Sequence, residues 1–155
     1  MFALINIDLY DIYLVSFDSK YKYDTWRPYT AIRNGEKDGN PATIRDEHWE
    51  PEMLTPPWPE YPSAHAAVGG GGAEIVANIF GSRGVSFTME STSTLPESKI
   101  RTYHNLDSAA MDCARSRIMN GYHFRFATDE GLNQGRRVAR HILKNYLRPL
   151  TRSNR

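Results

Sequence analysis

The chain has 155 residues, of which 40% are hydrophobic and 24% charged, and its formal net charge is +1. This size and composition fit one globular domain over residues 1–155 and leave no room for a second full domain. The near-neutral charge gives no electrostatic reason to expect a nucleic-acid or membrane partner, so any anion binding must be local. With one cysteine, Cys113, no intrachain disulfide is possible.

The first predicted element is a helix from Ala3 to Tyr23, ended by Pro28, because its apolar residues recur roughly every three to four positions. The same stretch carries Asp8 and Asp11 and has no basic region or small-residue cleavage site. We therefore expect neither a signal peptide nor a transmembrane span, and the compartment stays open.

A long loop is predicted from Asn34 to Pro62, because this segment is rich in proline, glycine and charge and has no sustained period. Loops of this length inside a compact domain are usually functional or disordered. Function is favoured here by three aromatic residues that could anchor the loop, Trp49, Trp58 and Tyr61.

Three further helices are predicted, over Ala64–Phe80, Leu106–Asn120 and Glu130–Tyr146. Gly81 and Gly121 would end the first two, and Pro149 would stop the last. The connection from Ser86 to Ser98 is expected to be irregular, and no strand pair is convincing. The predicted architecture is therefore all-α.

A run of four glycines, Gly69 to Gly72, lies inside the second predicted helix, where each glycine costs ~1 kcal/mol relative to alanine. A phosphate-binding loop would need a Gly-Lys-Ser/Thr ending, which is missing. Close packing between helices explains the run better.

Lys20 and Arg27 are seven residues apart on the first predicted helix, so they should lie nearly on one face, ~10.5 Å apart along the axis. Their long side chains could converge on one small anion, although two solvated cations are the more ordinary interpretation. Pro28 shifts the balance towards convergence because it fixes the chain exit just after Arg27.

Ser63 is predicted at a helix start, where its hydroxyl and the first free backbone N–H groups face outward together. Helix N-termini bind oxyanions readily, although a plain N-cap is an equally good interpretation of this serine. His65 could then act as a general acid or base on a bound oxyanion, or be an ordinary surface residue.

Arg117 and His123 are six residues apart, with Gly121 between them. A glycine at this position lets the helix end and the chain fold back, which makes their convergence plausible. The remaining histidines have no metal-ligand spacing and are interpreted as structural or surface residues: His48, His104 and His141.

These residues together would form a cage for a small tetrahedral or trigonal-bipyramidal oxyanion. The cage would contain three cations, a helix N-terminus and two imidazoles. Its side chains are Lys20, Arg27, Ser63, His65, Arg117 and His123.

The order Lys20-x6-Arg27-Pro28, then Pro62-Ser63-Ala64-His65, then Ser116-Arg117-x5-His123 resembles the three-part signature of vanadium-dependent haloperoxidases and type-2 phosphatidic acid phosphatases. Each part is short, but the three in this order are specific. The flanking words Trp26-Arg27-Pro28-Tyr29-Thr30, Pro57-Trp58-Pro59-Glu60-Tyr61 and Gly121-Tyr122-His123-Phe124 look like the haloperoxidase branch. The resemblance runs from about Ala3 to Pro149 and implies a helical bundle of that type.

The resemblance implies orthovanadate as cofactor, with hydrogen peroxide, a halide and a small organic acceptor as reaction partners. The residues that would bind the vanadate oxygens are Lys20, Arg27, Ser63, the backbone N–H of Ala64, and Arg117. His123 would be the axial vanadium ligand, His65 the acid–base residue, and Lys20 would also polarise bound peroxide. The metal would act as a Lewis acid, and the hypohalous product would halogenate the acceptor.

Trp58 stands where the family places an aromatic or polar residue near the halide, so it is the candidate for tuning halide choice. Two positions depart from the pattern. Ala64 replaces the usual glycine. Alanine keeps the backbone N–H but cannot adopt a positive φ at low cost, so we expect a slightly altered site and not an abolished one. Ala127 stands where phosphatase relatives carry an aspartate that orients the histidine, and Asp129 or Glu130 could substitute for it.

Family members are usually much longer, so the resemblance implies that this chain is the C-terminal catalytic half without its N-terminal helices. An apolar helix face would then be exposed, and a homo-oligomer is one way to cover it. Export of a longer form would fit the family. Two other functions stay open: an acid-phosphatase-type phosphomonoester hydrolase with His123 as nucleophile, and a truncated, non-catalytic oxyanion-binding helical protein.

Overall fold

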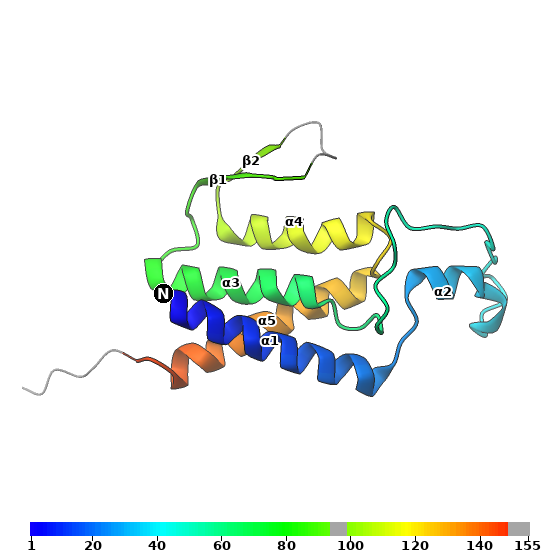
Figure 1. Ribbon diagram of the computed structural model, residues 1–155, viewed down its shortest axis with the longest axis horizontal. Helices are drawn as coiled ribbons and strands as arrows, with labels where there is room; N and C mark the ends of the chain where they lie inside the picture. The colour runs from blue at the N-terminus through cyan, green and yellow to red at the C-terminus, as the bar shows by residue number, and fades with distance from the viewer. Residues whose placement is uncertain (94–98, 149–155) are drawn as a thin grey trace, which may run out of the picture.

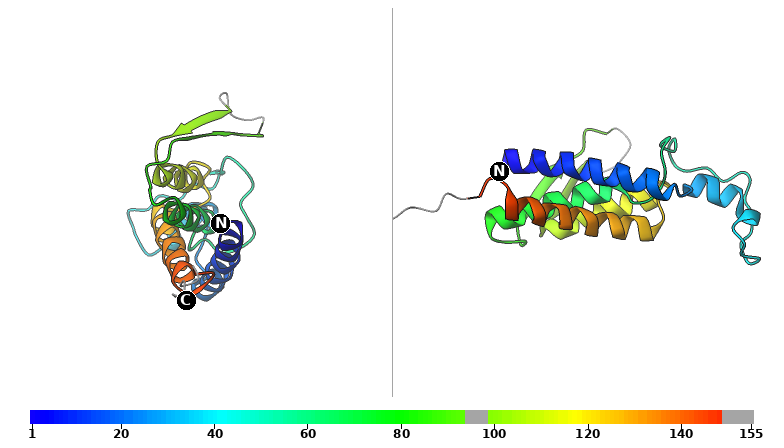
Figure 2. Two further views of the ribbon diagram at one scale, coloured as in Figure 1. Left: turned by 90° about the vertical axis from the view of Figure 1, so that its left-hand side faces the viewer. Right: turned by 90° about the horizontal axis from the view of Figure 1, so that it is seen from below.

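The computed structural model describes residues 1–93 and 99–148. Four long helices pack along their lengths as a bundle (Figures 1 and 2): α1 (Phe2–Tyr23), α3 (Ala64–Phe80), α4 (Leu106–Met119) and α5 (Arg125–Asn145). The central helix is α3, which contacts the three others. The helical bundle predicted from the sequence is therefore confirmed. Over the described ranges, no helix combines the length and apolar character that crossing a bilayer requires.

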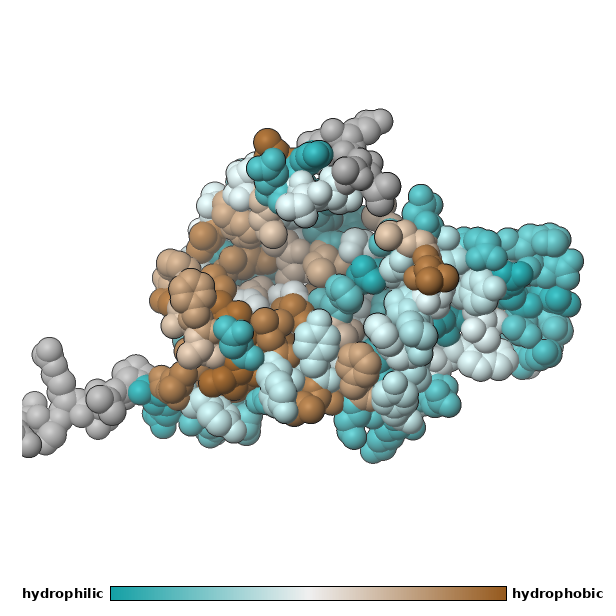
Figure 3. All heavy atoms as spheres, viewed as in Figure 1, coloured by the Kyte–Doolittle hydropathy of each residue, from teal (hydrophilic) through white to brown (hydrophobic). Residues whose placement is uncertain are grey.

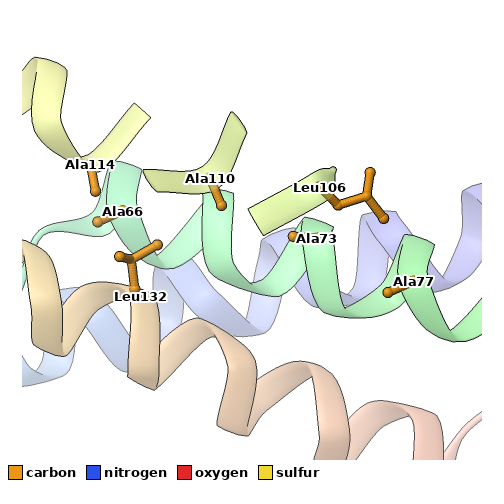
Figure 4. Packing of buried hydrophobic residues seen from close by; sticks show 7 residues of the cluster. All are labelled: Ala66, Ala73, Ala77, Leu106, Ala110, Ala114 and Leu132. Atoms are coloured by element: carbon orange, nitrogen blue, oxygen red, sulfur yellow. The ribbon is translucent and has the colours of Figure 1, made fainter. Parts of the chain in front are cut away.

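Small residues let α3 and α5 approach closely. A Cβ added at Gly135 would overlap the carbonyl oxygen of Ala67, and one at Gly70 would overlap the carbonyl oxygen of Leu132. On the opposite side of α3, alanines pack against α4 in a thin apolar layer that Leu132 of α5 closes (Figure 4). The predicted role of the glycine run in close helix packing thus holds for Gly70 and for Gly71, whose Cβ would overlap Ile12 of α1.

Successive long helices run in opposite directions, so two C-terminal and two N-terminal helix ends lie at the same end of the bundle. In Figure 1 the C-terminal ends of α1 and α4 and the N-terminal ends of α3 and α5 lie at the right-hand end of the bundle. The segment between α1 and α3 runs outwards from this end and returns to it. Residues near these four helix ends are therefore neighbours although they are far apart in the sequence.

The structure differs from the prediction in its short elements. A helix α2 (Pro28–Arg33) and a 3-10 turn η1 (Gly35–Lys37) follow α1. An antiparallel pair, β1 (Phe87–Glu90) and β2 (Ile100–Tyr103), interrupts the connection expected to be irregular. Each strand has four residues, the shortest length at which alternation indicates a strand, and most positions of both strands are exposed. Residues 94–98 and Pro149, which were part of the prediction, lie outside the described residues.

The last helix, α5, begins at Arg125, five residues before the predicted start at Glu130. Its N-cap is Phe124, which makes no side-chain capping hydrogen bond, so the usual serine, threonine or aspartate signal is missing.

Part of the bundle surface is apolar. Figure 3 shows hydrophobic side chains gathered over the bundle, whereas the segment around α2 is hydrophilic. On α1, Tyr10 and Leu14 are 66% and 54% exposed. The exposed apolar helix face expected from the sequence is present.

Candidate oxyanion-binding site

Lys20 lies in the last turn of α1 and is buried, with 1% of its surface exposed. Its Nζ donates hydrogen bonds to the carbonyl oxygens of Pro59, at 2.8 Å, and Glu60, at 2.9 Å. Burial and the nearby Arg27 lower the pKa of Lys20 to about 7, although the carboxylate of Glu60 acts in the opposite direction. The ordinary interpretation of Lys20 as a solvated surface cation is therefore wrong.

Arg27 does not share a helix with Lys20, contrary to the prediction. Helix α1 ends at Tyr23, Asp24 takes a left-handed conformation with φ of 44°, and Arg27 is the N-cap of α2. The prediction failed because Pro28 was interpreted as a helix end, whereas proline is also favoured at the first position of a new helix. The turn between two helices, not a common helical face, brings the two cations together.

The guanidinium of Arg27 connects the loop before α3 to the turn before α5. Its Nε donates to the carbonyl oxygen of Trp58, and its Nη1 to the carbonyl oxygen of Tyr122, each at 2.9 Å. The same Nη1 lies 2.9 Å from Nε2 of His123. Burial, opposed by the carboxylate of Glu60 and reinforced by the neighbouring Arg117, lowers the pKa of Arg27 to about 10.

His123 lies against a buried carboxylate that belongs to the loop before α3. Its Nδ1 is 2.8 Å from Oε1 of Glu60, and the same oxygen accepts a hydrogen bond from the N–H of Phe124 at 3.0 Å. Burial, with the cations Arg27 and Lys20, holds the pKa of His123 far below its usual 6.5, so the imidazole is neutral. Burial also raises the pKa of Glu60 to about 7, against the N–H of Phe124 and the charge of Arg27.

Arg117 reaches the same place from the end of α4. Gly121 has φ of 72° and follows the helix end, as predicted, and the N–H groups of Tyr122 and His123 return to the carbonyl oxygen of Arg117 at 3.0 and 3.3 Å. The guanidinium of Arg117 stacks on the ring of Tyr122, 4.7 Å from its centroid. Its Nε is buried and has no hydrogen-bond partner within the described residues.

Ser63 is the N-cap of α3, so the plain capping role considered for it is real. Its Oγ accepts a hydrogen bond from the N–H of Ala66 at 3.4 Å, which leaves the hydroxyl hydrogen available to a ligand. The N–H of Ala64 is at the first helical position, and no acceptor for it is found in residues 1–93 and 99–148. These donors belong to the end of the bundle that also holds Lys20 and His123.

His65, in the first turn of α3, is exposed, as the surface-residue interpretation expects. Partial burial lowers its pKa below 6.5, and the cations Arg117, Arg27 and Lys20 add to this effect. The imidazole is therefore neutral near neutral pH, which is the form that can accept a proton, although the cations weaken it as a base.

Trp58 contributes its carbonyl oxygen to the cluster, through Arg27, while its indole packs on Phe17 of α1 with ring centroids 5.6 Å apart. The indole is 38% exposed, on the rim of a cavity of about 750 Å³ that Arg27 also lines. The three histidines interpreted as surface residues are exposed: His48, His104 and His141. No cluster of three or more metal-binding side chains occurs in the described part of the chain.

The charges of the cluster do not balance. It contains three cations, Lys20, Arg27 and Arg117, and the carboxylate of Glu60, and burial lowers the pKa of each cation. A buried excess of positive charge is unfavourable unless an anion compensates it. Together with the unpartnered Nε of Arg117, this excess fits a small oxyanion such as vanadate or phosphate.

Comparison with known proteins decides the family. Residues 1–152 match the model of the VCPO second helical-bundle domain. The chain belongs to this family. It is 30% identical to the vanadium chloroperoxidase of Curvularia inaequalis over 97 residues, which cover 54% of this chain and 15% of that protein.

Two solved bacterial structures of the same kind resemble the fold. One is a vanadium-dependent iodoperoxidase, with a TM-score of 0.74 and 28% identity over 91% of this chain and 32% of the other. The second is a holo-type vanadium-dependent chloroperoxidase, which has a TM-score of 0.72 and 21% identity over 88% of this chain and 33% of the other. The chain thus spans about a third of the length of these solved relatives.

Sequence reasoning missed Glu60. The substitutes considered for the missing aspartate were Asp129 and Glu130, but Asp129 is exposed and Glu130 forms an ion pair with Arg137. The available signal was one acidic residue among prolines and aromatics, three positions before Ser63. Nothing in that pattern shows that the carboxylate is buried or that it contacts the imidazole of His123.

Proposed function

We propose that this chain carries the vanadate site of a vanadium-dependent haloperoxidase, which oxidises a halide with hydrogen peroxide to a hypohalous species that halogenates small organic acceptors. The observation that carries the proposal is the buried excess of positive charge around the neutral imidazole of His123. Family membership and the names of the relatives support it.

Each residue would have a distinct task. Lys20, Arg27 and Arg117 would neutralise the oxyanion and donate hydrogen bonds to its oxygens, and the hydroxyl of Ser63 and the N–H of Ala64 would add two neutral donors. His123 would offer the lone pair of Nε2 as a ligand to the vanadium. When bound, vanadate would supply a Lewis acid that activates hydrogen peroxide towards halide, and the oxidation state of vanadium would not change.

This assignment requires a rotation of an N–H group of Arg27 and a proton transfer through His65. Nη1 of Arg27 now donates to Nε2 of His123, so that N–H must turn towards the oxyanion before Nε2 can ligate. His65, with its lowered pKa, would accept a proton from hydrogen peroxide as it enters and return it to the leaving oxygen.

The direct test is bromination of a dimedone-type acceptor by the purified chain with bromide and hydrogen peroxide, with and without orthovanadate. We expect turnover that depends on vanadate, is suppressed by excess phosphate, and is lost in Lys20→Ala and His123→Ala. Turnover that survives in both variants, or that does not need vanadate, would contradict the proposal.

One observation favours a second candidate, a phosphomonoester hydrolase. The carboxylate of Glu60 contacts Nδ1 of His123, and a nucleophilic histidine needs such a partner. Nε2 of His123 would attack phosphorus while the ester P–O bond breaks and His65 protonates the leaving oxygen; water would then cleave the P–N bond. Hydrolysis of p-nitrophenyl phosphate without bromination would favour this candidate.

The two enzymatic candidates share an anion site, and a non-catalytic oxyanion-binding protein would share it too. A ligand that binds only the folded state raises its stability by mass action. Stabilisation by vanadate and phosphate with neither activity would therefore favour the non-catalytic candidate, and an unfolding midpoint unaffected by either anion would contradict all three.

A further inference from the structure

We infer that Glu60 is the positioning residue of His123: its carboxylate oxygen holds the imidazole as the Nδ1–H tautomer with the Nε2 lone pair directed into the oxyanion site. The inference deepens the proposed function and rests on it for the role of Nε2. The inference rests on six hydrogen bonds around Glu60 and His123 and on the fact that a guanidinium has no acceptor.

The tautomer follows from the partners of the two ring nitrogens. An arginine has N–H donors and no acceptor, so Nε2 of His123, 2.9 Å from Nη1 of Arg27, must provide a lone pair. The proton of the neutral ring is therefore on Nδ1, and it is donated to Oε1 of Glu60 at 2.8 Å. If Oε1 were the donor, both ring nitrogens would have to accept, which a neutral imidazole with one N–H cannot do; the same oxygen also accepts the N–H of Phe124.

The backbone of Glu60 is fixed on both sides, which makes its carboxylate a rigid support. Its N–H donates to the carbonyl oxygen of Thr25 at 3.0 Å, and its carbonyl oxygen accepts from Nζ of Lys20 at 2.9 Å. The next residue, Tyr61, donates its N–H to Oγ1 of Thr25 at 3.1 Å. Glu60 thus connects Lys20 through its main chain to His123 through its side chain.

The second carboxylate oxygen allows the acceptor role to be separated from the charge. Among the described residues, Oε2 of Glu60 has no hydrogen-bond partner, and the residue is 0% exposed. Glutamine has the same shape and keeps an acceptor at the Oε1 position, but carries no charge. Aspartate keeps the charge, but it is shorter by one methylene, so its oxygen lies farther from His123. Leucine has a similar volume and removes both the charge and the acceptor.

We would compare Glu60→Gln, Glu60→Asp and Glu60→Leu with the wild type, using Glu130→Gln as the control for loss of a carboxylate outside the site. Affinities for inorganic phosphate and orthovanadate are measured by calorimetry at a temperature at which circular dichroism shows each variant folded. Orienting partners of a metal-ligating histidine typically affect affinity about 10- to 100-fold. We expect Glu60→Gln and Glu130→Gln to stay within about threefold of the wild type, and Glu60→Asp and Glu60→Leu to lose about tenfold or more.

The tautomer of His123 can be measured directly, and it would not depend on Glu60 if Glu60 had only a structural role. In spectra of ¹⁵N-histidine-labelled protein, with His123 assigned by its loss in His123→Gln, we expect a protonated Nδ1 and an unprotonated Nε2 in the wild type and in Glu60→Gln. An Nε2–H tautomer in the wild type would overturn the inference, as would a Glu60→Gln affinity as low as that of Glu60→Leu, or an unchanged Glu60→Leu affinity. If Glu60→Leu does not fold, Glu60→Asp decides the same point.

Failure of the proposed function remains distinguishable from failure of this inference. A wild type that binds neither phosphate nor vanadate would contradict the proposed function. The tautomer of His123 in the anion-free protein would still decide whether Glu60 sets the orientation of the ring.

Discussion

Nζ of Lys20 donates to the carbonyl oxygen of Glu60 at 2.9 Å, so the buried ammonium is held by the main chain of this residue and not by its carboxylate. The second acceptor is also a carbonyl oxygen, that of Pro59. Neutral acceptors do not compensate the charge, and the pKa of Lys20 falls to about 7, chiefly through burial and then through Arg27. A bound oxyanion would supply the missing negative charge.

Oxyanion binding should therefore take up a proton above pH 7. In the anion-free chain Lys20 loses its proton as the pH rises through about 7, whereas a bound anion favours the charged form and raises the pKa. We expect sulfate, whose own charge is constant in this range, to bind with uptake of up to about one proton at pH 8 and much less at pH 6. Calorimetry in buffers of different ionisation enthalpy measures this number.

Glu60, whose pKa is also about 7, would take up protons in the same direction on anion binding. The variant Glu60→Gln removes that contribution and Lys20→Met removes the other, so uptake should persist in the first and decrease in the second. Sulfate affinity that is independent of pH between 6 and 9 in the wild type would contradict the assignment of Lys20.

Arg117 should contribute strongly to anion affinity, because its buried Nε has no partner within the described residues. A hydrogen bond to a charged group contributes about 1.5–3 kcal/mol, so Arg117→Gln should weaken phosphate binding roughly 10- to 100-fold. The matched control is Arg115→Gln, on the same helix but exposed, which should change affinity less than about twofold. Equal losses in the two variants, measured by calorimetry, would mean that only net charge matters.

The sequence allowed the bundle and most of the site to be predicted, because both depend on local patterns. The spacing of apolar residues indicated α1, and start and stop signals indicated α3 and α4 to within a few residues. Gly121 also indicated the turn that returns His123 to the end of α4. The motifs indicated Lys20, Arg27 and Arg117 as the cations of the candidate site, and all three lie in one cluster.

Glu60 could not be predicted, because its role depends on a contact across 63 residues of sequence. The same limit explains the error about Arg27: its place beside Lys20 depends on a left-handed residue, Asp24, at which the helix ends. Helix α5 was predicted to start late because Phe124 is not a typical capping residue. Long-range contacts and unusual capping residues are difficult to recognise in a single sequence.

Asp8 should make the stability of the chain depend on pH. Its side chain is buried between helices, one carboxylate oxygen has no partner among the described residues, and burial, with the nearby charge of Asp11, raises its pKa from 3.8 to about 7. The folded state then holds a proton that the unfolded state has lost, so the contribution of Asp8 to the free energy of unfolding falls as pH rises from 3.8 to 7.

Urea unfolding of the wild type and of Asp8→Asn at pH 5 and pH 8 isolates this contribution. Between these pH values the wild type should lose ~2–3 kcal/mol more than Asp8→Asn, which cannot titrate. Asp11→Asn, whose side chain is on the same helix, is the control and should keep most of the wild-type pH dependence. Equal pH dependence in the wild type and Asp8→Asn would mean that Asp8 is hydrated and charged in the folded protein.

Replacing a glycine of the bundle by alanine should lower the stability at one position and raise it at another, depending on the atoms that the added Cβ would contact. At Gly135 a Cβ would overlap the carbonyl oxygen of Ala67, so the variant must separate α5 from α3. Overpacking of this kind costs typically 1–3 kcal/mol. At Gly72, in the middle of α3, no atom of the described residues outside the helix's own backbone and the adjoining residues lies within 4 Å of the added Cβ. Replacing a helical glycine by alanine then stabilises by roughly 0.5–1 kcal/mol.

Urea unfolding of Gly135→Ala and Gly72→Ala measures both effects on the same helix pair. Because α5 also packs against the start of α3, where a Cβ at Gly131 would overlap the carbonyl oxygen of Ser63, Gly131→Ala should lower both stability and phosphate affinity. Gly72→Ala should leave the affinity unchanged, since it is about two and a half turns from Ser63 on α3. If Gly135→Ala stabilised the chain as Gly72→Ala does, α3 and α5 would not be packed as closely as their glycines require.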